Sequence, residues 1–107
     1  MPKPDEPLIS AQTPLGFVAT VDMMRWKLIT SIQHPVMAGH EREISDTLGN
    51  PDEIRQSRSD PDVLLFYKRA PARRWYCAVV KRLDGQAFLI TAYPTDAIKE
   101  ELRIWPS

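Results

Sequence analysis

The spacing of hydrophobic positions changes near Pro51, about halfway along the chain. Before Pro51 they recur every three or four residues, which is typical of one face of a helix. After Pro51 they alternate or form short continuous runs, as they do in β-strands. The pattern predicts an α+β domain with one or two N-terminal helices packed on a four-stranded antiparallel sheet.

Two helices are expected in the first half of the chain. Asp22 can cap the first helix, which runs to about Gln33. Residues 26–30 also fit a strand, because isoleucine and threonine favour β-structure. The second helix is predicted over 35–48, with Pro35 in its first turn. Its buried face would carry Met37, His40, Ile44 and Leu48.

The second half of the chain predicts four strands and one clear hairpin. The strands are expected over 52–57, 63–69, 75–83 and 87–93. Asp84-Gly85, between the last two, is a strong hairpin signal because these residue types tolerate the positive φ of a tight turn. A two-residue loop there pairs Leu83 with Gln86, and uninterrupted pairing places Tyr76 opposite Tyr93.

Uninterrupted pairing also assigns the side chains of this hairpin to two faces. One face is expected to lie under the helices and carries Trp75, Cys77, Val79, Phe88, Ile90 and Ala92. The other face carries Tyr76, Ala78, Val80, Arg82, Leu89, Thr91 and Tyr93. This second face mixes tyrosine, threonine and arginine with small apolar residues, which suits a ligand surface better than a core.

The two ends of the chain have weaker patterns. Residues 1–14 contain four prolines and no periodicity, so we expect a flexible tail before a single domain over 15–107. Residues 17–21 fit a short strand at the entry to this domain. Residues 96–105 fit a short helix or an irregular packing segment.

Composition narrows the class of protein. With 107 residues, 43% of them apolar, the chain has room for one core. Its one cysteine, Cys77, is expected to be a buried, inert thiol. One cysteine and two histidines are too few for a structural zinc site, and we predict no metal or cofactor. The absence of a signal-peptide pattern and of a membrane-spanning apolar run predicts a cytoplasmic location without membrane contact.

Charge is balanced overall but not along the chain. The formal net charge is zero, yet residues 54–82 carry eight basic and two acidic side chains. Such a segment indicates a surface that faces a polyanion. Lysine and arginine are also common at ordinary sheet edges, which is the competing interpretation.

Several short phrases of the sequence, taken in order, resemble one family of nucleases. The phrases are Trp26-Lys27-Leu28-Ile29, His34-Pro35, Asn50-Pro51-Asp52-Glu53-Ile54-Arg55-Gln56-Ser57, Val63-Leu64-Leu65-Phe66-Tyr67, Cys77-Ala78-Val79-Val80-Lys81 and Ile90-Thr91-Ala92-Tyr93-Pro94-Thr95. Over about residues 17–105, the chain is similar to short stand-alone members of the phage-associated barnase–EndoU–colicin–RelE-like nuclease superfamily.

The resemblance implies a fold, an activity and partners. Helices before a four-stranded antiparallel sheet are expected, together with metal-independent cleavage of RNA by attack of the ribose 2′-hydroxyl on phosphate. RNA would be the substrate, and a toxin or phage-conflict role implies an inhibitor or antitoxin protein as partner. The alternative is a catalytically inactive protein-interaction module of the same fold, because fold does not determine function.

The candidate catalytic residues are His34, Tyr67, Thr91 and Tyr93. Histidine suits proton transfer near neutral pH, and His34 precedes the helix that Pro35 opens, where free N–H groups favour a phosphate. The competing interpretation is that His34 only caps that helix. Tyr67 resembles the family's sheet tyrosine, while Thr91 and Tyr93 share the mixed face.

The candidate substrate-binding residues are Arg55, Ser57, Arg58, Tyr76 and Arg82. If Ile54 points to the core, alternation places Arg55 and Ser57 on the open face, with Arg58 as the fallback. Arg82 lies on the mixed face and could clamp phosphate through its planar guanidinium. Tyr76 could stack on a base or simply pair with Tyr93 across the strands.

Overall fold

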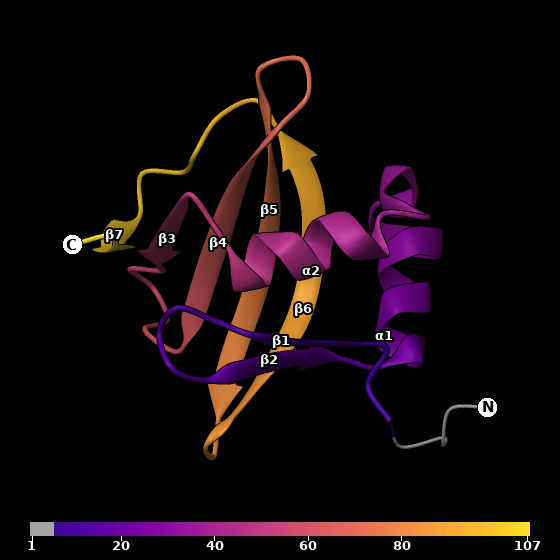
Figure 1. Cartoon of the computed structure of the whole chain (residues 1–107), viewed down its shortest axis with the longest axis horizontal. Helices are drawn as coiled ribbons and strands as arrows, with labels where there is room; N and C mark the ends of the chain where they lie inside the picture. Colours follow the sequence, from indigo (N-terminus) through magenta and orange to yellow (C-terminus); the bar gives the residue numbers. More distant parts are fainter. Residues whose placement is uncertain (1–5) are drawn as a thin grey trace.

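The computed structural model describes residues 6–107 and confirms the α+β class (Figure 1). The helical elements are α1 (Met23–Leu28), a π-helical turn η1 (Ile29–Gln33), a 3-10 turn η2 (Pro35–Met37) and α2 (Glu41–Gly49). The strands are β1 (Ile9–Gln12), β2 (Val18–Val21), β3 (Glu53–Gln56), β4 (Val63–Ala70), β5 (Arg74–Leu83), β6 (Gln86–Thr95) and β7 (Leu102–Trp105).

The sheet is larger than the four antiparallel strands expected. It has seven strands in the order β1-β2-β6-β5-β4-β3-β7, and it is mixed because β2 runs parallel to β6 at the pair Thr20 and Phe88. The four expected strands are present as β3 to β6. Of the three further strands, β2 confirms the short strand expected over 17–21, whereas β1 and β7 were not predicted and have only four residues each, too few for a clear alternating pattern.

The strands β1 and β7 correct two expectations for the ends of the chain. The tail predicted over 1–14 is wrong for Ile9–Gln12, which pair with β2, whereas residues 1–5 lie outside the described residues. At the other end, Leu102–Trp105 pair with β3. The stretch 96–101 is irregular, which was one of the two structures expected for residues 96–105.

The two predicted helices are present, but the second is broken. Asp22 caps α1 through a 2.7 Å hydrogen bond accepted from the Arg25 N–H, and helical structure continues to Gln33 as predicted. Gly39 adopts a φ of +83°, a conformation that a helix cannot contain. The predicted helix over 35–48 is therefore split into η2 and α2.

The predicted turn at Asp84-Gly85 is confirmed, but the pairing beyond it is interrupted. Leu83 lies opposite Gln86, and both turn residues have positive φ. A register shift follows, so that Tyr93 pairs with Cys77 and not with Tyr76. This extra residue in β6 is a β-bulge, which moves the side chains after it to the other face.

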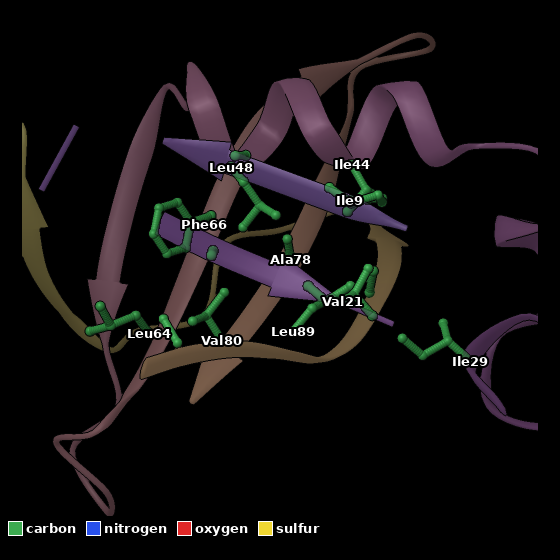
Figure 2. Close-up of a cluster of buried hydrophobic side chains, with 14 of the residues drawn as sticks. Ile9, Val21, Ile29, Ile44, Leu48, Leu64, Phe66, Ala78, Val80 and Leu89 are labelled. Atoms are coloured by element: carbon green, nitrogen blue, oxygen red, sulfur yellow. The ribbon is translucent and has the colours of Figure 1, made fainter. Parts of the chain in front are cut away.

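The helices cover the face of the sheet opposite to the one predicted. In Figure 1, α2 and the β1–β2 hairpin cross the same side of β4, β5 and β6. Figure 2 shows Phe66, Ala78, Val80 and Leu89 beneath them, packed with Ile44 and Leu48. The expected burial of Val79, Phe88 and Ile90 under the second helix is wrong, since Phe88 is 39% exposed and the other two join a cluster on the far face.

A connecting segment lies against that far face. Residues 96–101, here called the strap, join β6 to β7, which stand four places apart in the sheet. Ile98 of the strap packs on a second apolar cluster formed by Leu65, Tyr67, Cys77 and Val79. The far face is therefore partly covered by the chain itself.

Candidate functional site

Three of the four predicted catalytic residues meet where η1 ends beside β6. The imidazole of His34 lies 5.3 Å from the ring of Tyr93, measured between centroids. The Thr91 hydroxyl donates a 2.8 Å hydrogen bond to the Gln33 side-chain oxygen. The bulge makes this possible, because it turns Thr91 and Tyr93 away from the face that the helices cover.

The structure adds Gln33 and Lys99 to this group. The Lys99 ammonium lies 5.6 Å from the centroid of the Tyr93 ring, close enough for a cation–π contact. His34 and Lys99 thus both contact the same tyrosine ring. Gln33 could have been suspected from the sequence, because it is the neighbour of His34. Lys99 could not, because only the course of the strap brings it to this group. We call His34, Thr91, Tyr93, Lys99 and Gln33 the β6 site.

The helix-terminus argument for His34 is wrong. His34 precedes only the three-residue turn η2, and α2 begins later, at Glu41. A turn of this length offers no aligned set of free N–H groups to a phosphate. Any role of His34 must therefore come from its side chain and its neighbours on β6.

Two tyrosine hydroxyls of the predicted set point into the protein. Tyr67 is fully buried, and its hydroxyl oxygen accepts a 3.2 Å hydrogen bond from the Lys99 N–H. The Tyr93 hydroxyl is buried and, among residues 6–107, has no hydrogen-bond partner. Burial raises the pKa of both tyrosines, which keeps them neutral at ordinary pH. Both therefore form the floor of the β6 site.

Cys77 completes this floor as the buried thiol that the sequence predicted. Burial raises its pKa from 9.0 to about 11, in spite of neighbouring tyrosine hydroxyls that favour the thiolate. A neutral thiol enclosed by apolar neighbours is a poor nucleophile. The structure thus assigns Cys77 to packing.

This floor predicts a loss of stability in alkali. Between pH 9 and 11 the unfolded chain loses the Cys77 proton while the folded chain retains it. The free energy of unfolding should therefore fall as pH rises, by on the order of 2–3 kcal/mol from Cys77. Urea titrations across this range measure the loss, and Cys77→Ala is the control that should lessen it. An equally steep loss in Cys77→Ala would contradict this assignment.

Two of the predicted substrate-binding arginines hold the strap. Arg55 pairs with Glu53 at 2.5 Å and donates a 2.8 Å hydrogen bond to the carbonyl oxygen of Glu101. The Arg58 N–H donates to the Glu101 carboxylate at 2.6 Å. These contacts fasten the strap to the β3 side of the sheet, so both arginines have a structural task.

The other predicted binding residues lie apart from His34. The Arg82 guanidinium stacks over the Phe17 ring at 4.5 Å, near the hairpin end of β6. Tyr93 lies six residues further along β6 than the residue that pairs with Arg82, a distance of about 20 Å. Ser57 shares a 3.1 Å hydrogen bond with Ser59 in the loop after β3. Tyr76 lies on the helix side, 5.9 Å from the His40 ring. The predicted binding set is not a single surface.

Comparison with known proteins yields no match for this chain among protein-family models, curated proteins or solved structures. Among the described residues, no helix is long and apolar enough to cross a membrane. Nor do residues 6–107 contain a group of three or more histidine, cysteine or acidic side chains placed to hold a metal ion. Of the polar side chains that the sequence predicted, His34, Thr91 and Tyr93 are the ones that lie together, at the β6 site.

Proposed function

We propose that this chain is a metal-independent endoribonuclease of the barnase–EndoU–colicin–RelE-like superfamily, acting on RNA in the cytoplasm. The observation that carries the proposal is the convergence of His34, Thr91 and Tyr93 beside β6. His34 follows η1, whereas Thr91 and Tyr93 lie in β6, more than 50 residues later, and the sequence alone predicts all three as catalytic residues. Their convergence, together with the resemblance, supports a shared task.

In the proposed reaction, His34 accepts the proton of the ribose 2′-hydroxyl as its oxygen attacks phosphorus. The bond between phosphorus and the 5′-oxygen breaks, and a water molecule from the solvent donates a proton to that oxygen, which leaves as a hydroxyl. His34 then releases its proton to the solvent. Lys99 offsets the negative charge that develops on the phosphate oxygens. The products are a 2′,3′-cyclic phosphate and a free 5′-hydroxyl.

The remaining side chains of the β6 site orient these groups. The ring of Tyr93 packs against His34 and fixes the plane of the imidazole. Thr91 and Gln33 hold each other through one hydrogen bond and present a hydroxyl and an amide beside His34. Such groups position a phosphate by hydrogen bonds without supplying charge.

The experiment is an RNA cleavage assay with purified protein in excess chelator. We expect cleavage to persist and the upstream products to end in a cyclic phosphate, because no step of the proposed reaction uses a metal ion. Activity that vanishes with chelator and returns with added divalent cation would contradict the mechanism. Failure to cleave any RNA at high protein concentration would contradict the activity itself.

A catalytically inactive protein-interaction module is the second candidate function. It is favoured by exposed methionines on α1, where Met23 is 51% and Met24 is 83% exposed. Met24 and Leu28 line a surface groove of about 360 Å³. An inhibitor or antitoxin protein would be a partner under either function, and absence of cleavage would favour the module.

A further inference from the structure

A small cavity lies across the edge of β6 from the β6 site. Its volume is about 260 Å³, and its walls come from η2, His40, the turn between β4 and β5, and the adjoining ends of β5 and β6. Ligand cavities for drug-sized molecules usually measure about 300–1,000 Å³. A single planar ring system is therefore the size of ligand that this cavity suits.

The polar groups of the cavity gather on one aromatic wall. The rings of His40 and Tyr76 lie 5.9 Å apart, and the remaining lining is mainly valine, methionine, alanine and proline. His40 Nδ1 is buried and lies 3.3 Å from a Glu43 carboxylate oxygen, so the His40 ring contributes its aromatic surface to this wall.

The rim of the cavity carries a cation and a strained turn. Arg74 lines the cavity and forms an exposed ion pair with Asp96 at 3.0 Å, a type of contact that is readily exchanged for another anion. In the adjoining turn, Ala72 and Arg73 have φ of +62° and +60°, which is costly for residues with a side chain. Backbone strain of this kind tends to collect at binding sites.

The geometry points to this cavity as a pocket for one nucleobase, with Arg74 holding the phosphate of the same nucleotide. Unstacked bases of single-stranded RNA are recognised by stacking on aromatic side chains and by hydrogen bonds to their edges. Tyr76 and His40 supply the stacking surface. An apolar slot with one cation at its rim fits a base and its phosphate better than a simple anion.

The pocket deepens the proposed function, on which its assignment to RNA rests. Val36 lines the cavity two residues after His34, and Pro94 lines it directly after Tyr93. Two residues of chain span at most about 7 Å. A base in the cavity would thus belong to a nucleotide next to the linkage held at the β6 site, and the pocket would set the base preference of cleavage.

The test is a titration of the whole chain with the four nucleoside 5′-monophosphates, followed by backbone amide chemical shifts. Ribose 5-phosphate, which lacks the base, is the matched ligand. Val36→Trp fills the cavity, and Ile32→Trp is the matched control because Ile32 is 73% exposed and does not line it. Both sites are exposed enough to accept tryptophan without loss of the fold.

We expect at least one monophosphate to shift the amides of Val36, Ala72 and Tyr76. Ribose 5-phosphate and Val36→Trp should each weaken binding by roughly tenfold or more, the scale of one lost stacking contact. Equal binding of ribose 5-phosphate, or unchanged binding in Val36→Trp, would overturn the pocket. Nucleotide binding without RNA cleavage would support the pocket and contradict the nuclease function. RNA cleavage without amide shifts at the cavity would support the nuclease function and contradict the pocket.

Discussion

Replacement of His34 by alanine is expected to lower the rate of RNA cleavage by roughly 10²–10⁴-fold, the usual scale for a lost acid or base. His34 is half-buried at the end of η1 and takes part in no backbone pairing of the sheet. The substitution should therefore leave the fold intact, which the thermal unfolding midpoint of the variant can verify. The measurement is the single-turnover rate on a defined RNA with protein in excess.

Ile32→Ala is the matched control for this prediction. Ile32 lies two residues earlier in the same π-helical turn and is 73% exposed, so its truncation should leave the rate unchanged. If His34→Ala keeps full activity, cleavage stands but His34 is not the acid–base residue. If both variants lose activity equally, the effect belongs to the stability of η1 and not to the imidazole.

Replacement of Phe66 by alanine is expected to reduce the free energy of unfolding by about 3–5 kcal/mol. Phe66 is fully buried between the sheet and α2 (Figure 2). Its ring meets the ring of Phe17 edge-on, with 6.4 Å between the centroids. Removal of the ring leaves a cavity that the surrounding strands can fill only in part. Urea unfolding measures the loss, and Phe66→Leu provides a milder step if the alanine variant does not fold.

Phe88→Ala is the matched control, with the same chemistry at a different depth. Phe88 is 39% exposed on the far face, so we expect its removal to cost about 1 kcal/mol or less. Uninterrupted alternation of the hairpin placed Phe88 under the helices. A larger loss for Phe88→Ala than for Phe66→Ala would therefore show that the helices cover the other face.

Three members of the β6 site could be predicted from the sequence, but their arrangement could not. His34, Thr91 and Tyr93 were selected from residue chemistry and resemblance, and they do meet. The face of the sheet on which they meet depends on the register shift between Val79 and Val80, and no turn residue in the sequence predicts this shift. Arg55 was placed on the open face and Arg58 was the fallback, yet both bind the strap, because the local sequence pattern cannot predict a partner more than 40 residues away.

Sequence alone determined the elements whose causes lie within a few residues. Asp22 caps α1, Asp84-Gly85 forms the tight turn, and the apolar runs after Pro51 become β3 to β6. Only the tertiary structure decided which face of the sheet the helices cover. Both faces are apolar along β4 and β5, so alternation shows which side chains share a face but not which of the two faces the helices cover. That choice follows from the summed packing of α2 and the β1–β2 hairpin against distant strands, a quantity that no local window of sequence contains.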